Sequence, residues 1–136
     1  MRIAVIGGGN GAYAAAADLT ARGHQVRLWR RNAQALAASK ALTLKDADGE
    51  RRIEVASVSP DIAAALRGAE LVFMPDPAFT QLDHARRIAP HLADGQVVFF
   101  APGPDSELTQ SLATSYFTIV APPAGQSTRV MLCSAS

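Results

Sequence analysis

The first 32 residues place a glycine-rich turn between a short apolar segment and a helical segment, and this order constrains the fold more than any other feature. Residues 3–6 (IAVI) form a continuous apolar run rich in β-branched residues, which is typical of a strand buried on both faces. The turn GGGNGA follows at residues 7–12, and a helix to about Ala21 and a second strand over residues 25–29 come next. This order predicts the first strand–helix–strand unit of a parallel α/β sheet.

The glycine turn fits the pattern Gly-x-Gly-x-x-Gly/Ala at Gly7, Gly9 and Ala12. Gly7 permits a tight turn after the strand, the missing Cβ of Gly9 lets the backbone approach a pyrophosphate, and Ala12 keeps the helix close to the sheet. The unpaired N–H groups at the start of the helix would bind the phosphates. We therefore predict that this turn binds a dinucleotide, the alternative being a purely structural turn. The candidate contact residues are Gly7, Gly9, Asn10, Gly11 and Ala12.

The end of the second predicted strand should decide which dinucleotide binds. Proteins that bind NAD usually place a carboxylate here for the ribose 2′-hydroxyl, whereas those that bind NADP tend to place an arginine here for the 2′-phosphate. This chain has Trp29, Arg30 and Arg31 at that point and no acid. Guanidinium groups bind phosphate through paired hydrogen bonds, so the two arginines favour NADP(H) over NAD(H), with solvated loop charges as the alternative. Trp29 is expected either in the core or beside the adenine.

Alternating strand and helix signals continue along the rest of the chain. Asp48-Gly49 predicts a β-hairpin within residues 42–55, which is an insertion into the simple alternation. The pattern as a whole predicts a Rossmann-type, doubly wound, mostly parallel sheet with helices on both faces. Further helices are expected over residues 32–39, with Asn32 as cap, and over 61–68, 79–92 and 107–113. In the helix over 79–92, the residues expected to face the core are Phe79, Leu82, Ala85, Ala89 and Leu92. Further strands are expected over 69–74, 96–101 and 116–121, and an edge strand or frayed tail over 127–133.

Two proline-containing turns follow later strands at their carboxyl ends, where sheets of this class bind ligands. The first turn is PDPAF at residues 75–79, in which the prolines stiffen the backbone. The second turn begins with Pro102 and Gly103. We predict that these turns form a wall against the nicotinamide half of the dinucleotide, although the first is also a common start of a helix. The candidate residues are Pro75, Pro77, Phe79, Pro102 and Gly103.

Composition excludes several classes of protein. The chain of 136 residues allows one domain with a real core. Its net charge of +1 gives no basic excess for nucleic acid, and no apolar stretch approaches the roughly 20 residues that a bilayer requires. We therefore expect a cytoplasmic protein without nucleic-acid or membrane partners. Cys133 is the single cysteine, and His84 and His91 are expected on the surface, so neither a metal site nor a catalytic residue is predicted.

Two segments, residues 3–29 (IAVIGGGNGAYAAAADLTARGHQVRLW) and 77–103 (PAFTQLDHARRIAPHLADGQVVFFAPG), resemble the N-terminal domain of the octopine/nopaline (opine) dehydrogenase family. A more distant resemblance is to glycerol-3-phosphate dehydrogenases and ketopantoate reductases. The resemblance implies an NAD(P)-dependent oxidoreductase that reductively joins the amine of an amino acid to a 2-oxo acid. It also implies that the proton-transferring histidine and its carboxylate partner lie in a second, helical domain.

That second domain does not fit in this chain, so we expect residues 1–136 to form an NAD(P)-binding domain truncated at its C-terminal end. Such a domain would bind the cofactor without turnover, and an amino acid and a 2-oxo acid would bind only with the second domain present. The chain departs from many family members at Gln81, where they have a histidine. Apolar surface left uncovered predicts a homodimer. The alternatives are a stand-alone, non-catalytic NAD(P)-binding regulatory module and, from the glycine turn alone, a flavin site.

Overall fold

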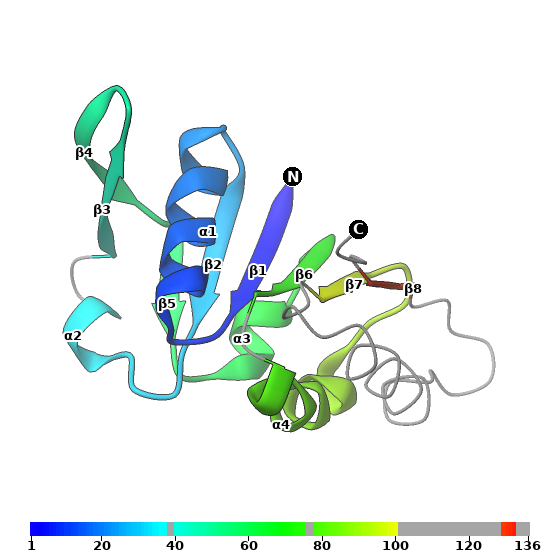
Figure 1. Ribbon diagram of the computed structural model, residues 1–136. Helices are drawn as coiled ribbons and strands as arrows, with labels where there is room; N and C mark the ends of the chain where they lie inside the picture. Colours follow the sequence, from blue (N-terminus) through cyan, green and yellow to red (C-terminus); the bar gives the residue numbers. More distant parts are fainter. Residues whose placement is uncertain (38–39, 76–77, 101–128, 133–136) are drawn as a thin grey trace.

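The computed structural model describes residues 1–37, 40–75, 78–100 and 129–132. These residues form a parallel sheet and a separate antiparallel hairpin (Figure 1). The strand order of the sheet is β5-β2-β1-β6-β7-β8, and every neighbouring pair is parallel. The strands are β1 (Arg2–Ile6), β2 (Gln25–Trp29), β3 (Ala41–Asp46), β4 (Gly49–Glu54), β5 (Ser57–Ser59), β6 (Leu71–Met74), β7 (Val97–Phe100) and β8 (Arg129–Leu132). The helices are α1 (Asn10–Ala21), α2 (Gln34–Ala37), α3 (Ile62–Leu66), α4 (Ala78–Ile88) and the 3-10 turn η1 (Ala89–His91).

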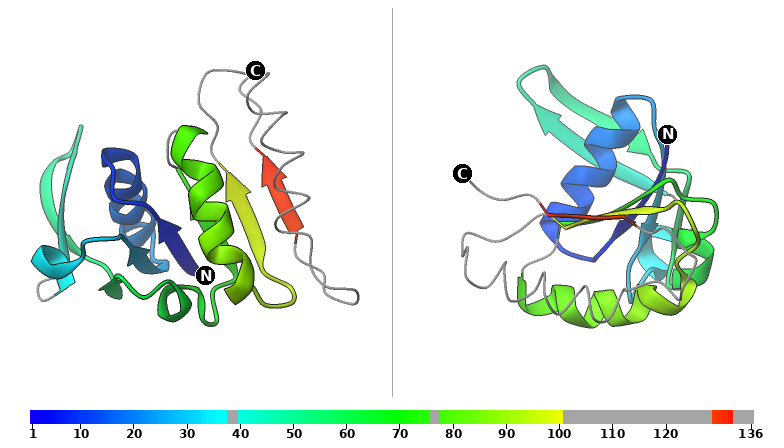
Figure 2. Two further views of the ribbon diagram at one scale, coloured as in Figure 1. Left: turned by 90° about the horizontal axis from the view of Figure 1, so that it is seen from below. Right: turned by 90° about the vertical axis from the view of Figure 1, so that its right-hand side faces the viewer.

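The order of the strands reverses between β1 and β6. The chain first adds β2 and β5 on one side of β1, and then β6, β7 and β8 on the other side. Helix α1 lies on one face of the sheet and α4 lies on the opposite face (Figure 2, right). The predicted Rossmann-type, doubly wound fold is therefore confirmed. In such sheets ligands bind at the carboxyl ends of the strands where the order reverses, which here are the ends of β1 and β6.

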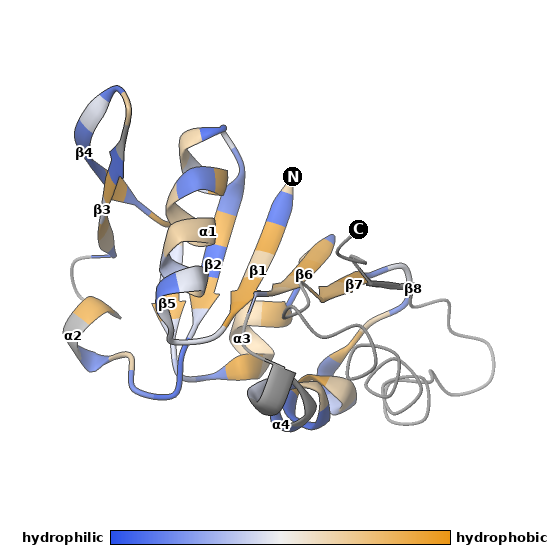
Figure 3. Cartoon of the chain, in the orientation of Figure 1, coloured by the Kyte–Doolittle hydropathy of each residue, from blue (hydrophilic) through white to orange (hydrophobic). Residues whose placement is uncertain are grey.

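The side chains of β1 alternate between two apolar cores, one on each face of the sheet. Ala4 and Ile6 pack in the core that α3 and α4 cover, whereas Ile3 and Val5 pack in the core that α1 and the hairpin cover. Burial on both sides explains why the segment IAVI is a continuous apolar run without polar alternation. Figure 3 shows the contrast between the hydrophobic strands β1 and β6 and the mostly hydrophilic β4.

Small side chains bring α1 close to the sheet. Ala12, Ala16 and Ala17 are buried on the inner face of the helix. The sequence predicted Ala12 and Ala16 on this face together with Ala15 and Leu19, but the last two are only partly buried. Ala17 takes the inner position because the helix also covers the hairpin, which widens its buried stripe.

Two local predictions differ from the structure, and one short strand was not predicted. Helix α2 begins at Gln34, two residues after Asn32, so Asn32 does not cap it. The turn of the hairpin is Ala47-Asp48, because Gly49 already pairs with Asp46 as the first residue of β4. The edge strand β5 was not predicted, since three residues are too short for a pattern of burial to show.

The helix predicted over residues 79–92 consists of α4 and η1. Ala85 and Ile88 are fully buried and Leu92 packs against the same core, whereas Ala89 is only partly buried. The core-facing stripe therefore passes through Ile88 in place of Ala89. The side chains of Phe79 and Leu82 lie outside the described part of the structure.

Of the edge strand and the frayed tail expected over residues 127–133, the structure has an edge strand at Arg129–Leu132, which pairs with β7 as β8. The helix predicted over residues 107–113 and the strand predicted over 116–121 lie outside the described residues, as does Cys133. Asp61 begins α3 as predicted, because its Oδ1 accepts a hydrogen bond from the backbone N–H of Ala63 at 3.0 Å.

Gln96 connects the start of β7 to the segment between α3 and β6. Its side-chain amide is buried, and Nε2 donates to the carbonyl oxygens of Leu66 at 2.8 Å and Ala69 at 3.0 Å. Its Oε1 accepts from the backbone N–H of Ala93 at 2.7 Å. Each polar atom of this side chain thus has a partner, which allows an amide to lie in the apolar core.

Candidate functional site

The glycine turn joins the carboxyl end of β1 to α1. Gly7 adopts φ +142°, a conformation that side chains with a Cβ rarely adopt, and its N–H donates to the carbonyl oxygen of Trp29 at 2.9 Å. A Cβ on Gly8 would lie 3.7 Å from the Cβ of Arg30. The turn therefore runs against the end of β2, where the sequence predicted the residues that distinguish NADP from NAD.

The first turn of α1 is open toward the outside of the molecule. Gly9 is the N-cap residue, and no side chain accepts a hydrogen bond there. The carbonyl oxygen of Gly9 accepts hydrogen bonds from the N–H groups of Ala12 and Tyr13. The N–H groups of Asn10 and Gly11 come before these in the chain and have no acceptor within the helix. A Cβ on Gly9 would meet nothing within 4 Å. The open backbone and the positive end of the helix form a site that suits an anion.

Pro75, which directly follows β6, lies against the first turn of α1. The strands β1 and β6 are the neighbours between which the strand order reverses. A Cβ on Gly11 would come within 3.3 Å of the carbonyl oxygen of Pro75. The structure thus brings together the glycine turn after β1 and the turn after β6. Of the other residues predicted for the nicotinamide half, Pro77, Pro102 and Gly103 lie outside the described residues, and Phe79 lies in α4 without a described side chain.

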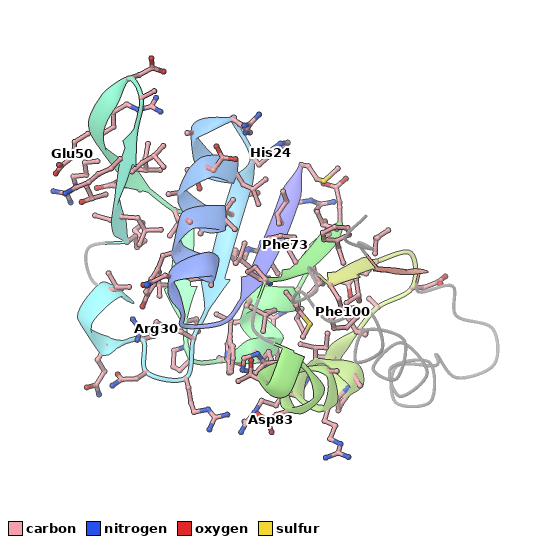
Figure 4. All side chains as sticks on the ribbon, in the orientation of Figure 1. His24, Arg30, Glu50, Phe73, Asp83 and Phe100 are labelled. Atoms are coloured by element: carbon pink, nitrogen blue, oxygen red, sulfur yellow. The ribbon has the colours of Figure 1, made fainter. Side chains whose placement is uncertain are left out.

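The two arginines after β2 have different partners. Nη1 of Arg30 donates to the hydroxyl of Tyr13, and its guanidinium carbon lies 5.3 Å from the centre of the Tyr13 ring. Nη2 of Arg31 lies 2.9 Å from Oδ2 of Asp83, and the same oxygen accepts from Nε of Arg87 at 2.9 Å. Figure 4 shows Arg30 beside the start of α1 and Asp83 on α4. The side chains therefore extend toward different helices.

The hydrogen bond from Arg87, together with the charges of Arg87 and Arg31, lowers the pKa of Asp83 below its usual value. Asp83 is therefore ionised at neutral pH and keeps its ion pair with Arg31. Neither Tyr13 nor Asp83 was among the predicted site residues. Each partner lies far from its arginine in the sequence, so spacing along the chain does not reveal either contact.

Trp29 lies in the core. It is 3% exposed, and its Nε1 donates to the carbonyl oxygen of Pro60 at 2.8 Å. The ring of His84 meets it edge-on, with the ring centres 5.3 Å apart. Of the two positions expected for Trp29, the structure has the core position rather than the surface beside the adenine. The expectation that His84 lies on the surface is wrong, because packing against Trp29 leaves it 8% exposed.

A groove of about 670 Å³ lies between α1, α2 and β3. Tyr13 and Arg30 line it together with Leu36 of α2 and Leu42 and Lys45 of β3. A second, mostly apolar hollow of about 420 Å³ lies where α1 meets β6 and β7. In that hollow the rings of Phe73 and Phe99 stack with their centres 5.3 Å apart.

The described part of the chain has neither a cluster of metal-binding side chains nor a helix that could span a membrane. No three side chains among histidine, cysteine, aspartate and glutamate come together there in a way that would hold a metal ion. Within the same residues, no helix is both long enough and apolar enough to cross a bilayer.

The parallel sheet, the reversal between β1 and β6 and the open glycine turn define a Rossmann-type domain. Residues 3–107 match the family described as ketopantoate reductase PanE/ApbA. The chain belongs to this family.

Relatives in sequence are dehydrogenases of two kinds. A glycerol-3-phosphate dehydrogenase [NAD(P)+] from Thioalkalivibrio sulfidiphilus (strain HL-EbGR7) is 34% identical over 106 residues, which cover 73% of this chain and 30% of the relative. An opine dehydrogenase from Arthrobacter sp. (strain 1C) is 30% identical over 103 residues, which cover 74% of this chain and 29% of the relative. This chain therefore spans about a third of the length of the relatives that it matches. The predicted resemblance to opine dehydrogenases and glycerol-3-phosphate dehydrogenases is confirmed.

Solved structures show the same fold. A PanE/ApbA family ketopantoate reductase from Ralstonia eutropha JMP134 superposes with a TM-score of 0.73 at 23% identity, over 97% of this chain and 40% of that one. An octopine dehydrogenase solved with NADH and L-arginine superposes with a TM-score of 0.75 at 22% identity, over 97% of this chain and 34% of that one. At these identities the similarity demonstrates the fold alone.

Proposed function

We propose that this chain binds a nicotinamide dinucleotide across the carboxyl ends of β1 and β6, with the diphosphate on the first turn of α1. The observation that carries this proposal is the open space at Gly9, where a Cβ would meet nothing within 4 Å beside uncapped helix N–H groups. The contact residues proposed for the diphosphate are Gly7, Gly9, Asn10, Gly11 and Ala12. Pro75 lies beside this turn, and Pro77, Phe79, Pro102 and Gly103 stay predictions for the nicotinamide half.

We further propose that the preferred dinucleotide is NADP(H). Arg30 directly follows β2, and Arg31 and Asn32 come next. None of the three residues is acidic, so none of them offers the carboxylate that typically binds the ribose 2′-hydroxyl of NAD(H). A guanidinium binds a phosphate dianion more strongly than a hydroxyl, because the hydrogen bonds are charge-assisted.

Within a larger dehydrogenase of the opine type, this domain would hold the cofactor while other parts of the protein bind an amino acid and a 2-oxo acid. The nicotinamide ring supplies the hydride chemistry when the cofactor is bound. This chain would position the cofactor through its backbone amides, and no catalytic acid or base is assigned to it. We therefore expect the isolated chain to bind the dinucleotide without turnover; a stand-alone regulatory module would have the same binding site.

A paired titration with NADPH and NADH tests this proposal. Trp29 is the only tryptophan, and energy transfer from its buried ring to the reduced nicotinamide of a bound nucleotide would quench its fluorescence. We expect both nucleotides to bind and NADPH to bind about 10- to 150-fold more tightly, because a charge-assisted phosphate contact contributes roughly 1.5–3 kcal/mol. The same chain with heat-denatured structure serves as the control for inner-filter effects. Absence of quenching by either nucleotide would contradict dinucleotide binding.

Self-association into a homodimer also stays a proposal. The apolar hollow beside Phe73 and Phe99 is the described surface that a second copy would cover. We expect the elution volume in size-exclusion chromatography to decrease as the loading concentration rises. An elution volume that corresponds to a monomer at every concentration would contradict self-association.

A further inference from the structure

We propose that Gly11 is a positioning residue for the nicotinamide half of the dinucleotide. Its missing Cβ lets the carbonyl oxygen of Pro75 lie against the first turn of α1, and this contact fixes the turn after β6 relative to the turn after β1. The inference rests on the proposed function and deepens it. It assigns a role to a glycine that the pattern Gly-x-Gly-x-x-Ala, which is fixed here at Gly7, Gly9 and Ala12, does not include.

The backbone of Gly11 does not itself require a glycine. Gly11 lies in the first turn of α1, and it is not one of the glycines with a positive φ, so its conformation suits any residue. Within a helix, glycine is the least favourable residue apart from proline. The absence of a side chain must therefore be explained by the space around Gly11.

That space differs from the space at the neighbouring glycines. A Cβ on Gly11 would lie 3.3 Å from the carbonyl oxygen of Pro75 and 3.9 Å from its Cβ. A Cβ on Gly9 would meet nothing within 4 Å, and one on Gly8 would make only ordinary van der Waals contact with Arg30, at 3.7 Å. Gly9 is therefore open toward the proposed ligand, whereas Gly11 faces another part of the protein.

Neither side of this contact can retreat easily. At 3.3 Å, a methyl group on residue 11 would force its neighbour to move by a few tenths of an ångström. Ala12 and Ala16 are buried against the sheet and hold α1 in place. Met74, directly before Pro75, is fully buried in the core on the opposite face, and the proline ring restricts φ. The displacement would therefore pass to the turn after β6.

The two turns lie at the same level of the sheet. Val5 of β1 pairs with Phe73 of β6, and each turn begins two residues after its member of this pair. The diphosphate proposed for the first turn and the nicotinamide proposed for the second belong to one ligand. The distance between the turns must therefore match the ligand, and Gly11 is the residue at which the turns come closest in the described part of the chain.

Isothermal titration calorimetry with NADPH and with 2′-phospho-ADP-ribose, which lacks the nicotinamide ring, tests this role on the 136-residue chain. We expect Gly11→Ala to weaken NADPH binding by about fivefold and 2′-phospho-ADP-ribose binding by less than about twofold, because only NADPH packs against the displaced turn. The variant should stay folded, since alanine favours the helix. Exposed Ala14→Gly makes the opposite change in α1, and as the matched control it should leave the ratio of the two affinities unchanged.

A double variant tests whether Gly11 acts through Pro75. Pro75→Ala keeps the carbonyl group but releases φ, so the turn can yield to a methyl group on residue 11. Gly11→Ala combined with Pro75→Ala should therefore weaken NADPH binding by less than the product of the two single effects. A double variant that shows the full product would overturn the role of Gly11, because the two residues would then act independently.

The ratio of the two affinities separates positioning from a structural role, because a loss of fold would weaken both ligands together. Equal weakening of both ligands by Gly11→Ala, or an unchanged ratio, would overturn the role of Gly11. Equal affinities of the unmodified chain for the two ligands would also overturn it, while diphosphate binding would stand. Failure of the unmodified chain to bind either ligand would overturn the proposed function as well.

Discussion

Replacing Gly9 with valine is expected to abolish dinucleotide binding while leaving the fold intact. The backbone of Gly9 has φ −88° and ψ 175°, an extended conformation that any residue adopts, and a Cβ there meets nothing within 4 Å. The valine side chain would therefore point into the space that the diphosphate is proposed to occupy. Losing the close approach of several N–H groups to the phosphates should weaken binding at least about 100-fold, which is roughly 2.7 kcal/mol.

The measurement is calorimetric titration of Gly9→Val with NADPH, together with its thermal unfolding. Ala21→Val adds a branched side chain at the exposed end of the same helix and serves as the matched control. Gly11→Val provides a contrast, because its Cβ would come within 3.3 Å of the carbonyl oxygen of Pro75 and should lower stability as well as binding. Undiminished affinity in Gly9→Val would show that the diphosphate does not lie at this turn.

Replacing Gln96 with leucine is expected to cause a large loss of stability without a direct effect on the nucleotide site. Leucine has a similar volume but cannot make the three hydrogen bonds of the Gln96 amide to Leu66, Ala69 and Ala93. The carbonyl oxygen of Leu66 still accepts from the N–H of Ala69, so two polar groups lose their partner. At about 1–3 kcal/mol for each group, we expect the free energy of unfolding to decrease by about 2–6 kcal/mol. Urea denaturation followed by circular dichroism measures this change.

The control for Gln96 is Gln25→Leu, since Gln25 is exposed on β2 and its side chain makes no hydrogen bond with the described residues. We expect the free energy of unfolding of this variant to lie within about 0.5 kcal/mol of that of the unmodified chain. A Gln96→Leu chain as stable as Gln25→Leu would show that the amide contacts contribute nothing to the fold.

Local sequence patterns were sufficient for the architecture and for the position of the glycine turn. The apolar run of β1, the glycines at residues 7–11 and the alanines of α1 each depend on their own neighbours in the chain, so the pattern and the structure agree. The β5 strand has only three residues and takes its place by pairing with β2, a contact that no local pattern contains. The observed hairpin turn lies one residue before the predicted one, because the register of β3 and β4 also depends on packing against α1.

Contacts between distant residues account for what the sequence did not predict at the site. Asp83 pairs with Arg31 from a position 52 residues away, and Tyr13 contacts Arg30 across 17 residues. The same holds for His84, which is polar by type and is buried because α4 places it against Trp29. Residue type and spacing predicted both arginines as phosphate ligands, and the fold shows that the two side chains have different partners.

The alternation of β1 between the two apolar cores has a consequence for how the domain melts. Ala4 and Ile6 pack against one layer, and Ile3 and Val5 pack against the other. If either layer separates from the sheet, one face of β1 becomes exposed and the packing of the other layer against the same strand is weakened. Partial unfolding would thus expose hydrocarbon on both sides of the molecule at once. Cooperativity between the two halves is therefore built into four consecutive residues.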